Sequence, residues 1–181
     1  MRSITVKNLT KIKKATPVIE SKIKIRISFG KGKRLTIRGN APNEFLVEKI
    51  IRAIDFGFDV EDTILLKNEN YVLEFIDLKN HTHRKNLKDV RARLIGTRGK
   101  AKRTIENLTG SIMVIHGNKI AVIVDTKHLD ITCNAIVSII QGSKHGNVFS
   151  YLEKQGKRRR MFDEEDLGLK ENFKDQKNNE A

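Results

Sequence analysis

Apolar residues recur along the chain at two spacings, which predict strands and helices in a regular order. A spacing of two is typical of strands with one buried face, and a spacing of three to four is typical of helices that bury one stripe. In residues 111–142, strand-like alternation occurs on both sides of a turn at residues 116–119, at Ile112, Val114, Ile120, Val122 and Val124. Helical spacing follows at Leu129, Ile131, Ala135, Ile136, Ile139 and Ile140, up to Gly142. This block predicts a hairpin and then a helix.

The residues before this block predict one strand and two helices. The strand covers residues 72–78, and a first helix runs from Leu87 to Gly96. A second helix covers residues 100–108, after a short turn, and ends at Thr109 and Gly110. The predicted order from residue 71 to residue 141 is strand, helix, turn, helix, strand, strand, helix.

The closing part of this pattern occurs twice, at a shift of 85 residues. The shift places Ile27 on Ile112, Phe29 on Val114, Asn40 on Asp125, Ile51 on Ile136, Ile54 on Ile139 and Gly57 on Gly142. The first copy also has a hairpin of its own, with residues 30–33 as its turn. We therefore expect two related units.

The first copy is shorter between its first two strands. That stretch has 19 positions in the first copy and 38 in the second. A helix together with a turn is not expected to fit there, and Pro17 disfavours a helix. Lys11 and Lys14 occupy the positions of Gly96 and Gly99. We expect the first unit to pack and to contribute charge without gripping a ligand at a glycine turn.

The segment 93–103 joins an apolar helix end, a Gly-x-x-Gly turn and a cationic run. Gly96 and Gly99 remove side chains where the main chain turns, so a phosphate can approach the amides that begin the next helix. The neighbouring cations are Arg98, Lys100, Lys102 and Arg103. Roughly 0.8 such glycine pairs are expected by chance, which is the false-positive risk of a short motif. The prediction of a phosphate-binding turn therefore depends on the flanking helices and charges as well as on the glycine pair.

The charge balance favours a polyanionic ligand. The chain has 36 Lys and Arg against 22 Asp and Glu, a net charge of +14 and a pI near 10.0. Residues 1–40 hold 12 basic and 1 acidic side chain, residues 41–80 hold 4 and 9, and residues 81–110 hold 9 and 2. The alternative is a generally basic, solvated surface adapted to salt or heat. Clustering of the charges argues against that alternative.

Other features exclude several classes of protein. Cys133 is the one cysteine, so a disulfide framework is excluded and a reducing compartment is expected. No stretch approaches the roughly 18 apolar residues of a membrane span, and there is no apolar signal-peptide core. His81 and His83 lack the partners of a metal site, and no convergent carboxylates suit a nuclease. We expect a cytoplasmic protein without catalytic residues, metal or cofactor, and without membrane association.

The helix, Gly-x-x-Gly turn and helix, followed by an antiparallel sheet and a third helix, resemble the type I KH domain. In that family the turn grips the backbone of about four unpaired nucleotides while an adjoining groove reads bases. The resemblance implies an RNA-binding set of Gly96, Thr97, Arg98 and Gly99 as the clamp, Lys100, Lys102 and Arg103 beside it, and Ile95, Ile105 and Ile112 building or flooring the groove. Lys102 stands where KH domains usually have an apolar residue, which shifts weight toward phosphate contact.

Two such units with the first degenerate, together with the segments 96–106, 140–149 and 53–58, resemble a narrower family. This is the family of archaeal and eukaryotic two-KH-domain factors of small-subunit ribosome assembly and pre-rRNA processing, whose eukaryotic member is called partner of Nob one. The resemblance implies binding of single-stranded RNA at the 3′ end region of the 16S-type precursor rRNA. It also implies proximity to the endonuclease that matures this rRNA and, in archaea, association with the α subunit of initiation factor two.

The expected fold is α+β, with two tandem type I KH-like units, each a three-stranded antiparallel sheet packed by helices. Residues 1–57 form the degenerate unit without Gly-x-x-Gly, 58–70 a helical connector, 71–155 the KH domain with Gly-x-x-Gly, and 156–181 a charged, flexible tail. One alternative function is an adaptor that docks the rRNA endonuclease or the initiation factor through an acidic helix surface within residues 44–62. Another is a general KH protein of messenger or exosome-bound RNA.

Overall fold

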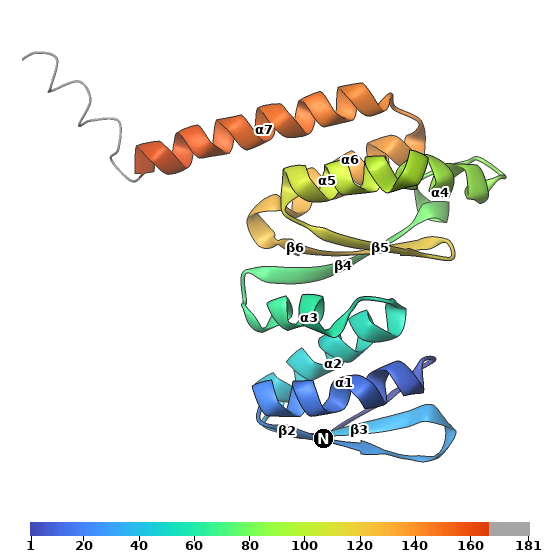
Figure 1. The fold of residues 1–181 in the computed structure, drawn as a ribbon, viewed down its shortest axis with the longest axis vertical. Coiled ribbons are helices and arrows are strands. Elements are labelled where there is room, and N and C mark those ends of the chain that lie inside the picture. The colour runs from blue at the N-terminus through green and yellow to red at the C-terminus, as the bar shows by residue number, and fades with distance from the viewer. Residues whose placement is uncertain (167–181) are drawn as a thin grey trace, which may run out of the picture.

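The computed structural model describes the backbone of residues 1–166 and the side chains of residues 1–158. The fold is α+β, with two three-stranded antiparallel sheets packed by helices (Figure 1). The first unit consists of β1 (Arg2–Thr5), α1 (Leu9–Lys22), β2 (Ile25–Phe29), a 3-10 turn (Lys31–Lys33), β3 (Arg34–Gly39) and α2 (Ala41–Phe56). A short helix α3 (Val60–Thr63) and a 3-10 turn (Ile64–Lys67) lead out of it.

The second unit repeats the strand topology of the first. It consists of β4 (Tyr71–Asp77), a 3-10 turn (Leu78–Asn80), α4 (Leu87–Ile95), a 3-10 turn (Thr97–Gly99), α5 (Lys100–Thr109), β5 (Ile112–His116), β6 (Lys119–Asp125), a 3-10 turn (Thr126–His128), α6 (Leu129–Gln141) and α7 (His145–Asp166). The strand orders are β1-β3-β2 and β4-β6-β5, so the third strand of each unit is central. Both sheets therefore have the same strand order, as expected of two related units.

The elements stack in layers (Figure 1). The first sheet lies at one end, α1, α2 and α3 lie between the two sheets, and α4, α5 and α6 cover the far face of the second sheet with α7 outermost. Helices of the first unit thus pack on the sheet of the second. One buried cluster joins them and includes Ile12, Ile19, Ile50, Ile54, Ala121 and Ile123. The two units share a hydrophobic core.

The central strand β6 is buried on both faces. All five residues from Ile120 to Val124 have no exposed surface. Ala121 and Ile123 belong to the shared core, whereas Ile120, Val122 and Val124 belong to a second cluster under the helices of the second unit. The alternation predicted from the sequence at Ile120, Val122 and Val124 covers only the face that packs under the helices of the second unit.

The region between β1 and β2 differs from the sequence-based prediction. It contains no Gly-x-x-Gly turn, but the expectation that Pro17 disfavours a helix there is wrong, because Pro17 lies inside α1. Ile12, Ala15, Thr16 and Ile19 are spaced to form one buried stripe of this helix. Burial of that stripe offsets the cost of about 3 kcal/mol that a proline imposes on a helix interior.

The predicted flexible tail also differs from the structure in its first part. Helix α7 crosses residue 155 without a break and continues to Asp166. It packs on α5 and α6, and Val148 and Leu152 are buried in the core of the second unit. Residues 145–158 therefore belong to that unit, and the predicted tail residues 167–181 lie outside the described part of the chain. None of the described helices combines the length and apolar character that a membrane crossing requires.

Candidate nucleic-acid interface

The Gly-x-x-Gly segment forms a tight turn between α4 and α5. The Gly96 N–H donates to the Ala92 carbonyl at 2.8 Å, and the Gly99 N–H donates to the Gly96 carbonyl at 3.1 Å. Positive φ angles occur at Gly96 (73°), Arg98 (52°) and Gly99 (76°). A non-glycine residue with positive φ is uncommon, so neighbouring contacts must stabilise the backbone conformation of Arg98.

The two glycines are required for different reasons. A Cβ at Gly96 would lie 2.7 Å from the Ala101 Cβ and 2.8 Å from the Ala101 N, so no side chain fits there. A Cβ at Gly99 would have Arg103 Nε, at 3.9 Å, as its one neighbour. Gly96 therefore allows the close packing of α5 against the turn. Gly99 leaves open space in which a ligand can approach the main chain.

Helix α5 begins at this open space without a cap. Gly99 precedes its first residue, no side chain accepts a hydrogen bond from its first N–H groups, and its first turn contains no acidic residue. Such a helix N-terminus attracts anions through its N–H groups and its dipole. Arg98 and Lys100 are exposed beside it. The geometry suits a phosphate.

Arg103 and Lys102 each make a contact within the protein. Arg103 Nη2 donates to the Arg98 carbonyl at 2.6 Å, which supports the unusual backbone of the turn. Lys102 Nζ pairs with Glu106 Oε1 at 2.9 Å, and the same oxygen accepts the Met113 N–H at 2.8 Å. Lys102 is thus partly neutralised. Glu106 was missed as a partner although its four-residue separation from Lys102 is the ordinary signal for a helix ion pair.

The three predicted groove residues lie in different environments. Ile95 is exposed by 38% directly before the turn. Ile105 is fully buried and offers no surface to a base. Ile112 packs against the shared core, on the sheet face turned to the first unit, so its prediction as a groove residue is wrong. Met113 and Ile115 face the helices instead, because successive side chains of a strand point to opposite faces.

Helix α4, which carries the turn, is fixed at both of its ends. The Asn86 side chain accepts the Lys88 N–H at 3.1 Å and caps its start. Near its end, Arg93 Nη2 donates to the carbonyls of Gly142, at 3.0 Å, and of Ser143. These contacts connect α4 to the segment between α6 and α7. The clamp is therefore built on a rigid scaffold.

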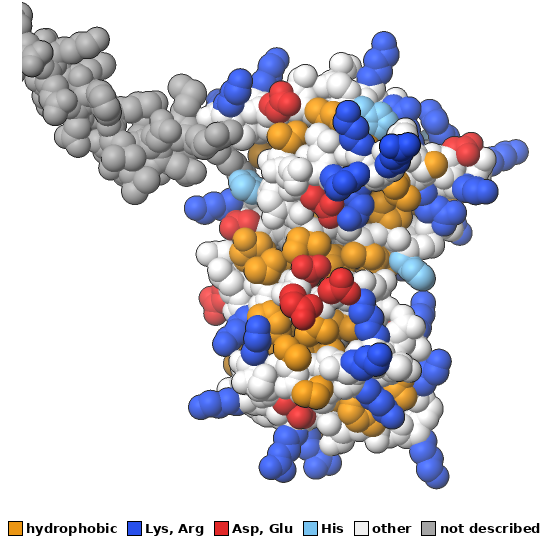
Figure 2. All heavy atoms as spheres, viewed as in Figure 1, with side chains coloured by type: hydrophobic (Ala, Val, Ile, Leu, Met, Phe, Trp, Pro, Cys, Tyr) orange, Lys and Arg blue, Asp and Glu red, His pale blue; other side chains and the backbone are white. Residues whose placement is uncertain are grey.

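The acidic surface predicted within residues 44–62 is smaller than expected. Glu48 pairs with Arg2 at 2.5 Å and with Arg52 at 2.6 Å, and Glu44 is also buried. The acids that remain on α3 and its start are Glu61, Asp62 and Asp59, and Asp59 pairs with Lys11 at 3.1 Å. Burial, followed by the charges of Asp59, Glu61 and Glu106, raises the pKa of the Asp62 carboxyl. In Figure 2, acidic side chains gather at mid-height on the face shown, with basic ones above and below.

The chain is similar to known KH-domain proteins. Residues 72–157 match the family model for the second KH domain of PNO1, described as a eukaryotic type KH domain (KH-domain type I). A KH domain-containing protein of Methanocaldococcus jannaschii is 28% identical over 143 residues, which cover 76% of this chain and 63% of that protein. The pre-rRNA-processing protein pno1 of Aspergillus fumigatus is 34% identical over 115 residues, which cover 61% of this chain and 46% of that protein.

A solved structure extends the similarity to both units. It is the complex of a/eIF2alpha, aDim2p and rRNA from Pyrococcus horikoshii, of which one chain aligns with a TM-score of 0.76 and 26% identity over 87% of this chain and 94% of its own length. The two curated relatives are matched over only 63% and 46% of their lengths. The family model, both relatives and the shared fold agree with one another. The chain is therefore similar to PNO1-like KH-domain proteins, and its residues 72–157 match the type I KH domain of that family.

Proposed function

We propose that this protein binds single-stranded RNA at the Gly-x-x-Gly turn of the second unit and catalyses no reaction. The observation that carries the proposal is the open Gly99 beside an uncapped helix N-terminus, with Arg98 and Lys100 exposed next to it. These groups suit a phosphodiester backbone, since both the amides and the cations favour an anion. The similarity to pre-rRNA-processing proteins supports small-subunit ribosome assembly as the process, and we propose the cytoplasm as its location.

In this mechanism the clamp fixes the backbone and a neighbouring surface meets the bases. One phosphate lies over Gly99 and the start of α5, while Arg98 and Lys100 neutralise the flanking phosphates. Ile95 offers the exposed apolar surface of the predicted groove set beside the turn. Arg103 holds the turn in shape, and Lys102 contributes less because Glu106 pairs with it. Affinity falls with salt, since each neutralised phosphate releases counterions.

The RNA proposed is the 3′ end region of the precursor rRNA of the small subunit, and the proposed protein partners are the rRNA-maturation endonuclease and the α subunit of initiation factor two. The similar chain in a complex of a/eIF2alpha, aDim2p and rRNA supports ribosomal RNA as the class of ligand and the initiation factor as a partner. The acids Asp59, Glu61 and Asp62 are the proposed protein contact because they lie on the connector between the two units. RNA and a protein partner then use different residues.

Fluorescence anisotropy over a salt series tests this proposal with three ligands: a single-stranded small-subunit rRNA 3′-end oligonucleotide, a scrambled strand and a duplex. Wild type is expected to prefer the rRNA end. Arg98→Asp is expected to weaken binding at least tenfold, and aspartate tolerates the left-handed backbone at this position. Lys13→Asp is the matched control, since Lys13 lies 85 residues earlier and exposed on α1. Equal binding of all three ligands, unchanged by Arg98→Asp, would refute the proposal.

A further inference from the structure

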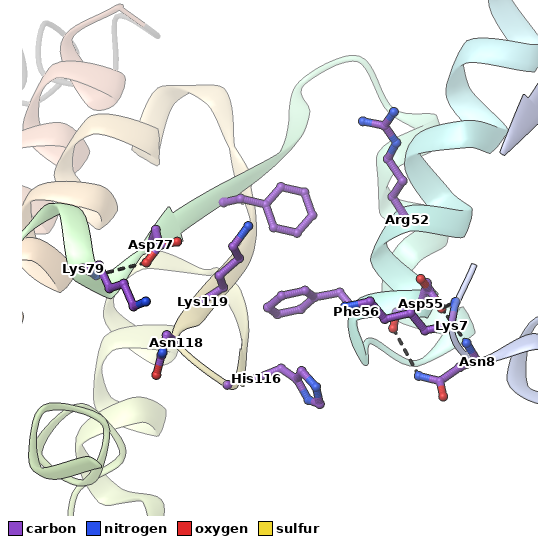
Figure 3. A pocket seen from close by; sticks show the side chains of 12 residues that line it. Lys7, Asn8, Arg52, Asp55, Phe56, Asp77, Lys79, His116, Asn118 and Lys119 are labelled. Carbon is purple, nitrogen blue, oxygen red and sulfur yellow. Dashed lines mark hydrogen bonds between the residues drawn. The ribbon is translucent and has the colours of Figure 1, made fainter. Parts of the chain in front are cut away.

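A cleft separate from the clamp lies between the two units, beside the β5–β6 turn (Figure 3). Its volume is about 630 Å³. The first unit contributes the β1–α1 loop and the end of α2, and the second unit contributes β4 and the β5–β6 turn. Phe56 from α2 and His116 and Lys119 from the β5–β6 hairpin approach one another across it (Figure 3). The clamp described above does not include this cleft.

Three aromatic rings meet in the cleft. The Phe56 ring lies 5.4 Å from the Phe75 ring at an angle of 74° and 6.0 Å from the His116 ring at 70°, measured between centroids. Phe75 is nevertheless 41% exposed. Edge-to-face contacts of this kind are favourable, but they leave much of the Phe75 ring uncovered.

Phe75 differs from the other exposed phenylalanines of the described chain. Lys13 lies over the Phe29 ring at 5.5 Å, and Lys49 and Arg2 lie over the Phe45 ring at 4.4 Å and 5.1 Å. No such cation lies over Phe75 among the described residues. Its ring is therefore available to a flat ligand.

The cleft is also cationic. Within the described part of the chain, the ammonium groups of Lys7, Lys79 and Lys119 have no hydrogen bond or ion pair. The two acids of the cleft are already engaged with main-chain amides: Asp55 accepts the Lys7 N–H at 2.8 Å, and Asp77 accepts the Lys79 N–H at 3.0 Å. Free ammonium groups beside an uncovered aromatic ring are the usual components of a single-stranded nucleic-acid site.

The cleft lies at the same end of the second unit as the Gly-x-x-Gly turn. Helix α5 ends just before β5 begins, and the two elements run in opposite directions, so the start of α5 is near the end of β5 (Figure 1). Arg91 Nη1 of α4 donates to the Gly117 carbonyl at 2.8 Å, which ties α4 to the β5–β6 turn. An RNA strand leaving the clamp can pass this turn and enter the cleft.

We propose that the cleft is a second RNA subsite, in which an unpaired base stacks on Phe75 and the adjacent phosphates lie beside Lys79 and Lys119. The strand is the one held at the Gly-x-x-Gly turn, so this inference rests on the proposed function. It extends that function because the first unit, which lacks a clamp, then contributes Phe56 and Lys7 to RNA binding. Base stacking takes place in the cleft, since the clamp itself has no aromatic residue.

A length series separates the two sites. The ligands are an RNA of about four nucleotides, which fills a KH clamp, and one of about ten, which reaches the cleft. Wild type is expected to bind the longer RNA more tightly. Phe75→Ala, and separately the pair Lys79→Ala with Lys119→Ala, are expected to lose about tenfold in affinity for the longer RNA and almost nothing for the shorter one. Phe45→Ala is the matched control, since Phe45 is 47% exposed on the first unit and does not line the cleft.

The outcomes distinguish this inference from the proposed function. If the cleft variants bind the longer RNA like wild type while Arg98→Asp weakens both ligands, the subsite is wrong and the clamp remains. The same result is expected if the cleft instead receives a protein. If wild type binds neither RNA, the proposed function fails and the subsite fails with it. The lysine pair lies at the surface and keeps the test valid if Phe75→Ala does not fold.

Discussion

The two units share a scaffold and differ between their first two strands. In each unit the third strand is followed by a helix that ends at a glycine with positive φ: α2 at Gly57 (138°) and α6 at Gly142 (111°). Between the first and second strands, the first unit has the single helix α1, whereas the second has α4, a glycine turn and α5. A binding site is thus produced by interrupting a helix on an otherwise repeated scaffold.

Charge alone does not make the clamp. The first 40 residues hold 12 basic side chains and 1 acidic one, and Lys11 and Lys14 occupy the positions of the glycines. Lys14 lies inside α1, where the main-chain N–H groups are used by the helix itself, and Lys11 lies in its first turn. The Asp55 carboxylate already accepts the Lys7 and Asn8 N–H groups just before that turn. The start of α5 instead follows a glycine turn in open space with no acid in its first turn, so it can receive an anion.

The largest effect on stability is expected from a substitution in the core that the two units share. Ile123→Ala removes a fully buried side chain from the shared core and should lower the free energy of unfolding by about 2–5 kcal/mol. Urea denaturation is expected to show one transition for both units, shifted as a whole. The control Val18→Ala, on the exposed side of α1, should change the free energy of unfolding by less than about 0.5 kcal/mol. Two separate transitions in wild type would refute the shared core.

The next effect compares matched positions of the two units. Gly96→Ala introduces a Cβ against the Ala101 main chain at positive φ and should cost about 1–3 kcal/mol in stability, with loss of RNA binding. Lys11→Ala changes the corresponding position of α1 and should cost less than about 1 kcal/mol. Thermal denaturation and anisotropy measure both variants. Similar losses in the two variants would contradict the contrast between the units.

A smaller effect concerns the proline in α1. The N–H restored by Pro17→Ala can donate to the Lys13 carbonyl one turn earlier, and a typical hydrogen bond contributes about 1 kcal/mol. The variant should therefore be more stable, with unchanged RNA affinity, in thermal denaturation and anisotropy. A destabilised variant would show that Pro17 contributes packing that offsets its missing donor.

The smallest effect depends on pH. The folded state raises the pKa of Asp62 above its value in the unfolded chain, so the carboxylate opposes folding at neutral pH and protonation relieves this as the pH falls through the raised pKa. Asp62→Asn should stabilise the protein at pH 7 by up to about 0.5 kcal/mol, and the difference should shrink in acid. Melting temperatures of wild type and Asp62→Asn at pH 7 and in acid test this prediction. A stability difference between the two proteins that grows in acid would contradict it.

The sequence predicts the second unit well because its signals are local. Alternation, helical spacing and the glycine turn at Gly96 and Gly99 are each visible within a few residues, and the structure has the predicted order of strands and helices along residues 71–141. The side of the sheet that meets the first unit could not be predicted, because residues 120–124 of β6 and residues 112–115 of β5 are all apolar and periodicity indicates only one face. Ile112 was misplaced for that reason, and α1 was missed because tertiary burial outweighs the local effect of Pro17.

Backbone amide NMR with a short rRNA 3′-end oligonucleotide would show which unit binds RNA. We expect the largest chemical-shift changes at Thr97, Arg98, Gly99 and Lys100, with residues 11–14 of α1 unchanged by a ligand that fills only the clamp. Changes centred on α1 and the β2–β3 turn, with the Gly-x-x-Gly amides unaffected, would contradict this expectation and would assign RNA binding to the first unit.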